Sequence, residues 1–185
     1  MDLPRFAVID VETSGLDHTT DRVLQVAIAT VDQGVIIDEW SSLIQVRWPW
    51  TKIGPSDIHG LSWWQLRNAP PAATVAAELA QRLDGTVVTA HNIGFDWPFI
   101  VELANTHQVV LPEVPRLCTL KLSRRLDPDR QLSHRLVDVC DRYGITIERA
   151  HDARYDARAT AQILPLLLSD HGITTRSQLA QRYER

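Results

Sequence analysis

Acidic side chains in three well-separated blocks constrain this 185-residue chain more than any other feature. Asp10 and Glu12 end an apolar run, Asp96 follows the residues HNIGF, and His151 comes five residues before Asp156. Carboxylates gathered at one place repel one another unless a cation lies between them, and a pair of divalent metal ions is the natural candidate. A fold that brings the blocks together is therefore predicted to be a phosphoryl-transfer enzyme.

The order of hydrophobic patterns predicts an α/β fold. Residues 5–11 form a continuous apolar run that is typical of a buried strand. Residues 23–31 and 35–44 are β-rich and flank the turn-forming residues DQG, so the chain should open as a three-stranded antiparallel meander. Further strands are expected at residues 86–90 and 116–119. Because helix-like segments alternate with these later strands, we expect a mixed sheet with helices on its faces.

Helices are predicted at 72–83, from about residue 96, and at 120–126, 132–143, 152–168 and 176–183. Gly85 and Gly144 follow two of these segments and supply stop signals. Pro98 is suited to the first turn of its helix. Residues 47–60 are rich in Pro, Gly and Trp and are predicted to form a surface loop.

The size and composition favour one domain in a reducing compartment. The chain is long enough for one buried core and short for two. Its N-terminus has no apolar signal region, and its longest late apolar run, residues 163–168, is far below membrane-spanning length. Only two cysteines occur. We therefore expect a cytoplasmic protein without membrane contact.

Charge is unevenly distributed around the net value of −4. Acidic residues predominate before residue 116, whereas basic residues predominate in 116–158. The arginines at 116, 124, 125, 130 and 135 could line a track for phosphate groups. An ordinary solvated surface explains any single one of them equally well.

Each acidic block has a metal-binding interpretation and a simpler alternative. Asp10 and Glu12 are two residues apart on a strand and project from the same face. Asp96 and Asp156 belong to helices, where a carboxylate can also cap a helix or face solvent. Together the four carboxylates could hold two Mg²⁺ or Mn²⁺ ions, and His151, in the loop before its helix, could accept a proton from the attacking water.

The blocks DVETSG (10–15), HNIGFD (91–96) and HDARYD (151–156) resemble the three motifs of the DEDDh, or DnaQ-like, 3′-to-5′ exonucleases. The resemblance covers about residues 5–168 of what we expect to be a single exonuclease domain, 1–185. It implies an RNase H-like fold with a five-stranded mixed sheet flanked by helices. The implied activity is metal-dependent hydrolysis that releases nucleoside 5′-monophosphates from a 3′ end.

The resemblance also implies a role for each acidic residue and for the histidine. Asp10 would bridge two Mg²⁺ or Mn²⁺ ions, while Glu12 and Asp156 would hold the ion on the side of the nucleophile. Asp96 would support the second ion or its water. His151 would be the general base.

Substrate contacts are expected from residues inside or beside the motifs. Thr13 would hold the terminal nucleotide near its 3′ hydroxyl, and the full expected set is Thr13, Ser14, His91, Asn92, Phe95 and Trp97. Two features depart from the family pattern. Trp97 and a proline directly follow Asp96, and a Trp-Pro-Trp sequence occupies residues 48–50.

The expected partner is the 3′ end of single-stranded DNA, in replication editing or repair. An exoribonuclease that trims RNA 3′ ends is an alternative with the same chemistry. A non-catalytic nucleic-acid-binding module is another, although such a module has no need for crowded carboxylates. A DNA polymerase or a second copy of the chain are further candidate partners.

Overall fold

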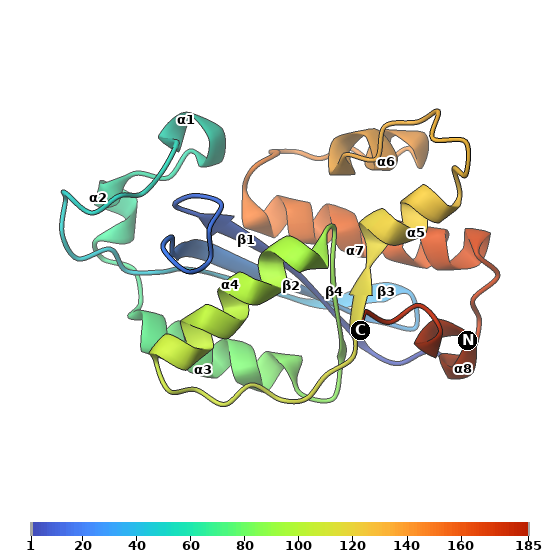
Figure 1. Ribbon diagram of the computed structural model, residues 1–185, viewed down its shortest axis with the longest axis horizontal. Coiled ribbons are helices and arrows are strands. Elements are labelled where there is room, and N and C mark those ends of the chain that lie inside the picture. The colour runs from blue at the N-terminus through green and yellow to red at the C-terminus, as the bar shows by residue number, and fades with distance from the viewer. Residues whose placement is uncertain (1, 185) are drawn as a thin grey trace.

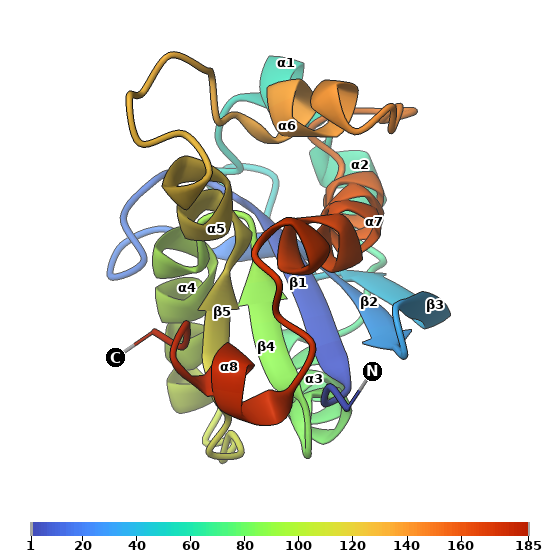
Figure 2. The same ribbon diagram turned by 90° about the vertical axis from the view of Figure 1, so that its right-hand side faces the viewer.

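A five-stranded mixed sheet forms the centre of the fold (Figure 1). The computed structural model describes residues 2–184. The strands are β1 (Phe6–Thr13), β2 (Val23–Asp32), β3 (Val35–Leu43), β4 (Val87–Ala90) and β5 (Arg116–Cys118). Their order is β3-β2-β1-β4-β5, which Figure 2 shows from right to left. The first three strands pair antiparallel, and β4 and β5 are added parallel to β1, as predicted.

The turn between β2 and β3 explains why the chain begins as a hairpin. Gln33 and Gly34 both have left-handed backbone conformations, with φ of 50° and 81°. Two left-handed residues match the twist of the flanking strands in a two-residue hairpin turn. Asp32 therefore pairs with Val35 directly across the turn.

Helices cover both faces of the sheet. They are α1 (Ser56–His59), α2 (Trp63–Leu66), α3 (Ala72–Leu83), α4 (Ile93–Thr106), α5 (Thr119–Arg125), α6 (Leu136–Arg142), α7 (Ala153–Asp170) and α8 (Arg176–Ala180). One core cluster joins Val8 to α5, α6 and α7, whereas a second joins Ile9 to α3 and α4. Because neighbouring strand residues face opposite sides, Asp10 and Glu12 lie on the α7 face with Val8.

Several element boundaries differ from the predicted ones. α4 starts at Ile93, because Asn92 adopts φ 90° and turns the chain directly from β4 into the helix. α6 is shorter than predicted, since the backbone N–H of Leu132 bonds to the carboxylate of Asp127 in a loop. The loop at 47–60 contains α1, which ends at Gly60 with φ 69°. Across residues 2–184, no helix combines the length and apolar character needed to span a lipid bilayer.

Candidate active site

Small side chains let helix α7 approach the strand that carries two of the carboxylates. Ala27 lies opposite Asp10 in the β1–β2 register, and it is buried against Ala153 and Ala157 of α7. Three methyl groups occupy this contact, so the helix and sheet backbones lie close together. Asp156 belongs to the same first turns of α7 and thereby reaches the face of β1 that carries Asp10.

The carboxylates of Asp10, Glu12 and Asp156 converge at the end of β1. One ligand oxygen from each lies within 4.8 Å of those of the other two. Hard divalent cations such as Mg²⁺ and Mn²⁺ prefer oxygen ligands of this kind. The donor set therefore fits a divalent cation.

Asp96 joins this cluster from the first turn of α4. Its side chain is only 4% exposed. Apart from burial, the charge of Asp96 is the largest influence that raises the pKa of Asp10. The structure thus brings the acids of the first and third sequence blocks together, and it places Asp96 of the second block close enough for its charge to act on Asp10.

Burial and mutual repulsion disfavour the ionised forms of these acids. Burial raises the pKa of Asp10 well above its usual range, with further contributions from Asp96, Asp156 and Glu12. Burial also raises the pKa of Glu12 to about 7, and that of Asp96 to about 7. Negative charge is therefore held here at a cost that a bound divalent cation would offset.

The raised pKa of Asp96 predicts a pH-dependent stability of the metal-free protein. Between its ordinary pKa and about 7, Asp96 keeps a proton in the folded state that it loses on unfolding. The folded state binds more protons, so the free energy of unfolding falls as pH rises through this window. We expect Asp96 to contribute a loss on the order of 2 to 4 kcal/mol between about pH 5 and about pH 8.

Denaturant unfolding in EDTA, compared between the wild type and Asp96→Asn, checks this prediction. Other groups titrate in the same window, so the difference between the two pH profiles is the measurement. The variant should lose less stability on going to high pH, because its amide cannot ionise. Parallel profiles would contradict the burial argument.

His151 lies in the loop immediately before α7. Its backbone adopts φ 62°, and its N–H donates to Asp156 Oδ2 at 3.0 Å. The side chain is exposed, and the imidazole makes no hydrogen bond within the described residues. The loop therefore fixes the backbone of His151 against a carboxylate of the cluster while leaving the ring available to an incoming molecule.

The model of the RNase T exonuclease family matches residues 7–164 of the chain. This stretch includes the acids of all three blocks and His151. The chain belongs to this exonuclease family. The predicted family and enzyme class are confirmed.

Curated relatives of the exonuclease domain are PolC-type DNA polymerases III. The protein from Streptococcus suis (strain 98HAH33) is 32% identical over 180 residues, and the one from Streptococcus thermophilus (strain ATCC BAA-491 / LMD-9) is 29% identical over 178 residues. Each alignment covers 94% of the chain but only 12% of the polymerase. The chain thus spans about an eighth of the length of these relatives.

Solved structures of similar fold are also exonucleases. E. coli Exonuclease I in complex with a dT13 oligonucleotide aligns with a TM-score of 0.79 and 20% identity, over 97% of this chain and 43% of that one. Exonuclease X in complex with 5′ overhanging duplex DNA aligns with a TM-score of 0.72 and 24% identity, over 97% of this chain and 98% of that one. The predicted RNase H-like architecture with its mixed sheet is confirmed.

Two further polar residues of the exonuclease domain lie at the acidic cluster. Asp152 caps α7 by accepting from Arg154 N at 3.2 Å, and it also accepts from Gln25 Nε2 at 3.0 Å. Gln25 lies opposite Glu12 across the β1–β2 pair. These contacts tie the start of α7 to the sheet. Sequence patterns could flag Asp152 as a helix cap, but the role of Gln25 depends on the strand register.

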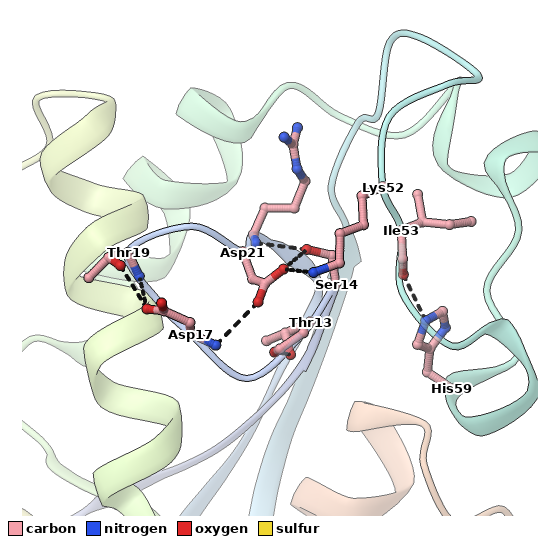
Figure 3. A network of polar contacts seen from close by, with 10 residues as sticks. Thr13, Ser14, Asp17, Thr19, Asp21, Lys52, Ile53 and His59 are labelled. Atoms are coloured by element: carbon pink, nitrogen blue, oxygen red, sulfur yellow. Dashed lines mark hydrogen bonds and ion pairs between the residues drawn. The ribbon is translucent and has the colours of Figure 1, made fainter.

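Ser14 and the loop at residues 47–60 are locked together beside the cluster (Figure 3). The Ser14 hydroxyl donates to Asp21 at 3.1 Å, and Lys52 pairs with the same carboxylate at 2.6 Å. A Cβ on Gly54 would lie 2.6 Å from the carbonyl oxygen of Ser14, so the loop backbone packs directly on it. The side chain of Ser14, expected to bind substrate, is buried in this contact.

The same loop is closed on itself by a histidine. His59 Nε2 contacts the carbonyl of Ile53 at 3.0 Å (Figure 3). Leu61 N donates to His59 Nδ1 at 3.0 Å. His59 is buried.

Thr13 donates to the carbonyl of Gly15 at 2.6 Å, which turns the chain at the end of β1.

Of the other residues expected to bind substrate, some are bonded within the protein and others are accessible at the surface. His91 contacts Thr119 Oγ1 at 3.0 Å and the carbonyl of His134 at 2.9 Å, so both ring nitrogens are occupied within the protein. This ring braces the site, and both of its nitrogens have partners inside the protein. Asn92 is exposed, and Phe95 is partly buried beside Phe99.

The tryptophans take different positions. Trp97 is partly buried in the core cluster of α3 and α4, and the guanidinium carbon of Arg116 lies 5.5 Å from its ring centroid. Trp48 and Trp50 stack on each other with ring centroids 5.2 Å apart, and they are 50% and 77% exposed. Trp64 is 70% exposed, so these three rings lie at the surface rather than in the core.

Proposed function

We propose that this exonuclease domain is a metal-dependent 3′-to-5′ exonuclease that removes nucleotides from single-stranded DNA. The observation that carries the proposal is the cluster of Asp10, Glu12 and Asp156 carboxylates, with buried Asp96 beside it. The DEDDh pattern supports the 3′-to-5′ direction. The polymerase relatives and the DNA complexes of the structural neighbours support DNA as the substrate.

Two Mg²⁺ or Mn²⁺ ions fit the proposed mechanism. Asp10, Glu12, Asp96 and Asp156 would hold them, and bound ions would activate the water and stabilise the negative charge that develops on the phosphate. His151 accepts a proton from the attacking water. The water oxygen forms a bond to phosphorus, the bond to the 3′ oxygen of the preceding nucleotide breaks, and that oxygen takes up a proton. A nucleoside 5′-monophosphate is released.

The substrate end is held where β1 ends. Thr13 would contact the terminal nucleotide near its 3′ hydroxyl. The loop at 47–60, fixed on Ser14, would form one wall of this position. Exposed Asn92 and partly buried Phe95 and Trp97 lie at the start of α4.

Digestion of end-labelled single strands tests the proposal. With Mg²⁺ or Mn²⁺, a 3′-labelled DNA strand should lose its label as mononucleotide at once, whereas a 5′-labelled strand should shorten progressively. EDTA should stop both reactions, because the carboxylates then lack their cations. Equal turnover in EDTA would contradict the metal-dependent mechanism. Early release of a 5′ label would show that digestion runs from the 5′ end.

Matched RNA and duplex substrates define the substrate class. We expect single-stranded DNA to be degraded faster than RNA of the same sequence. In a primer–template duplex, a mismatched primer end should be removed faster than a paired one, because it is already unpaired. Faster degradation of RNA would establish the exoribonuclease alternative.

A further inference from the structure

A basic cleft lies outside the acidic cluster and has no part in the mechanism above. It is formed by α5 and the loop that follows it, with a volume of about 600 Å³. The lining residues are Lys121, Arg124, Arg125, Asp127, Pro128, Arg130 and His134.

The positive charge of the cleft is largely uncompensated. Lys121 pairs with Glu184. Within residues 2–184, the exposed side chains of Arg124, Arg125 and Arg130 form no ion pair. The one acid of the cleft, Asp127, accepts hydrogen bonds from the loop backbone, which hold the pKa of its carboxyl below the usual range. The three guanidinium groups are therefore available to an anionic ligand.

The wall of the cleft is built by internal hydrogen bonds. Asp127 accepts from Gln131 N at 3.1 Å and from Leu132 N at 2.9 Å. Arg130 adopts φ 54° at the tip of the loop, and its N–H bonds to the carbonyl of Asp127 at 3.1 Å. His134 contacts Asp127 Oδ2 at 3.2 Å. This bonding fixes the loop before a ligand arrives, which lowers the entropic cost of binding.

The cleft also contains a serine, a histidine and an aspartate, but they do not form a hydrolytic active site. Ser123 Oγ contacts His134 Nδ1 at 2.9 Å, and His134 in turn contacts Asp127. However, Ser123 is 2% exposed and also accepts from Arg142 Nη2 at 3.0 Å. A nucleophile must reach its substrate, and this hydroxyl is enclosed. Its role is to support the wall.

The cleft lies at the carboxyl ends of the parallel strands, the same end of the sheet as the carboxylate cluster. α5 starts directly after β5 and leads away from the carboxyl end of that strand (Figure 1). His91, which follows β4, bonds to Thr119 at the start of α5 and to the carbonyl of His134 in the cleft wall. The pKa of His91 is lowered chiefly by burial, and Arg124 adds to this effect, so that guanidinium lies near the second motif.

We propose that this cleft binds the phosphodiester backbone of the substrate strand on the 5′ side of the nucleotide being removed. The inference rests on the proposed function, because that function places the 3′ end at the carboxylates. Guanidinium groups bind phosphate oxygens with charge-assisted hydrogen bonds and read no base sequence. The cleft would therefore favour long strands over short ones, with a strong dependence on salt.

Fluorescence anisotropy in EDTA tests the cleft without hydrolysis. The probes are a labelled single strand of about 12 nucleotides and a labelled dinucleotide, titrated with wild type and with Arg124→Gln/Arg125→Gln. The variant should bind the long strand about tenfold or more weakly, and its slope of log affinity against log salt should be shallower by about 1.4, since each lost phosphate contact removes about 0.7. Affinity for the dinucleotide should change much less.

Arg5→Gln/Arg176→Gln is the matched control. It removes the same charge from Arg5, which pairs with Asp32 just before β1, and from Arg176, the first residue of α8, which pairs with Asp2. This control should bind the long strand like the wild type, and melting temperatures should confirm that both variants are folded.

Each remaining outcome decides the inference. Equal loss on both probes, or no loss on the long strand, would overturn it. Displacement of the long strand by inorganic phosphate at constant ionic strength would assign the cleft to a small phosphate anion instead. If the wild type releases no nucleotides with Mn²⁺ but binding still depends on Arg124 and Arg125, the proposed function fails and the cleft is retained.

Discussion

Replacing Asp10 with alanine is expected to lower kcat by about 10⁴-fold or more, equivalent to about 5.5 kcal/mol of transition-state stabilisation. The carboxylate of Asp10 meets those of Glu12 and Asp156, and the charge of Asp96 further raises its pKa. A residue in this position would contact both proposed cations, so its loss removes a ligand from each. Single-turnover measurement of mononucleotide release at saturating Mn²⁺ gives the rate of the chemical step.

Folding can be separated from activity in this variant. Burial and the charges of its neighbours raise the pKa of Asp10. Removing this carboxylate therefore relieves repulsion, and the metal-free variant should melt at least as high as the wild type. Asp38→Ala, on the edge strand β3, is a matched control and should retain activity. Normal hydrolysis by Asp10→Ala would be incompatible with the proposed site.

Replacing His151 with alanine should slow hydrolysis by about 100-fold or more while substrate affinity changes little. The imidazole is exposed beside the cluster and makes no hydrogen bond in the described part of the chain, so a general-base role fits its surroundings. Single-turnover rates at saturating Mn²⁺, with strand affinity measured separately in EDTA, check this expectation.

Two further variants distinguish the role of the His151 ring from that of its backbone. His151 adopts φ 62°, a conformation that asparagine tolerates better than alanine. His151→Asn should therefore preserve the backbone bond to Asp156 and still lose activity. His107→Ala, at the far end of α4, should behave like the wild type. An unchanged rate in both His151 variants would assign the base role elsewhere.

Much of the fold could be predicted because hydrophobic periodicity is a local signal. The run at 5–11 became β1, and the turn at Gln33 and Gly34 produced the antiparallel hairpin. Boundaries were less predictable where side chains far apart in sequence determine them. α6 is shortened because Asp127 binds the backbone at Gln131 and Leu132, a contact that no periodic pattern contains.

The acidic cluster followed from the motif spacing, whereas its supporting residues did not. Asp10 and Glu12 of the first block meet Asp156 of the third. Gln25 could not be found in this way, because its contact with Asp152 depends on how β2 pairs with β1. Ser14 and His91 match the motifs, yet their polar atoms are used inside the protein.

The alanine contact between β2 and α7 limits how the acidic cluster can vary. Ala27, Ala153 and Ala157 separate the two backbones by methyl groups alone. A methyl group has no alternative rotamer, so the main-chain separation of Asp10 and Asp156 does not depend on flexible side chains packed between the helix and the sheet. Any larger residue would push the helix outward in a discrete step. The main-chain separation of the two carboxylate-bearing residues is consequently fixed when the helix docks on the sheet during folding.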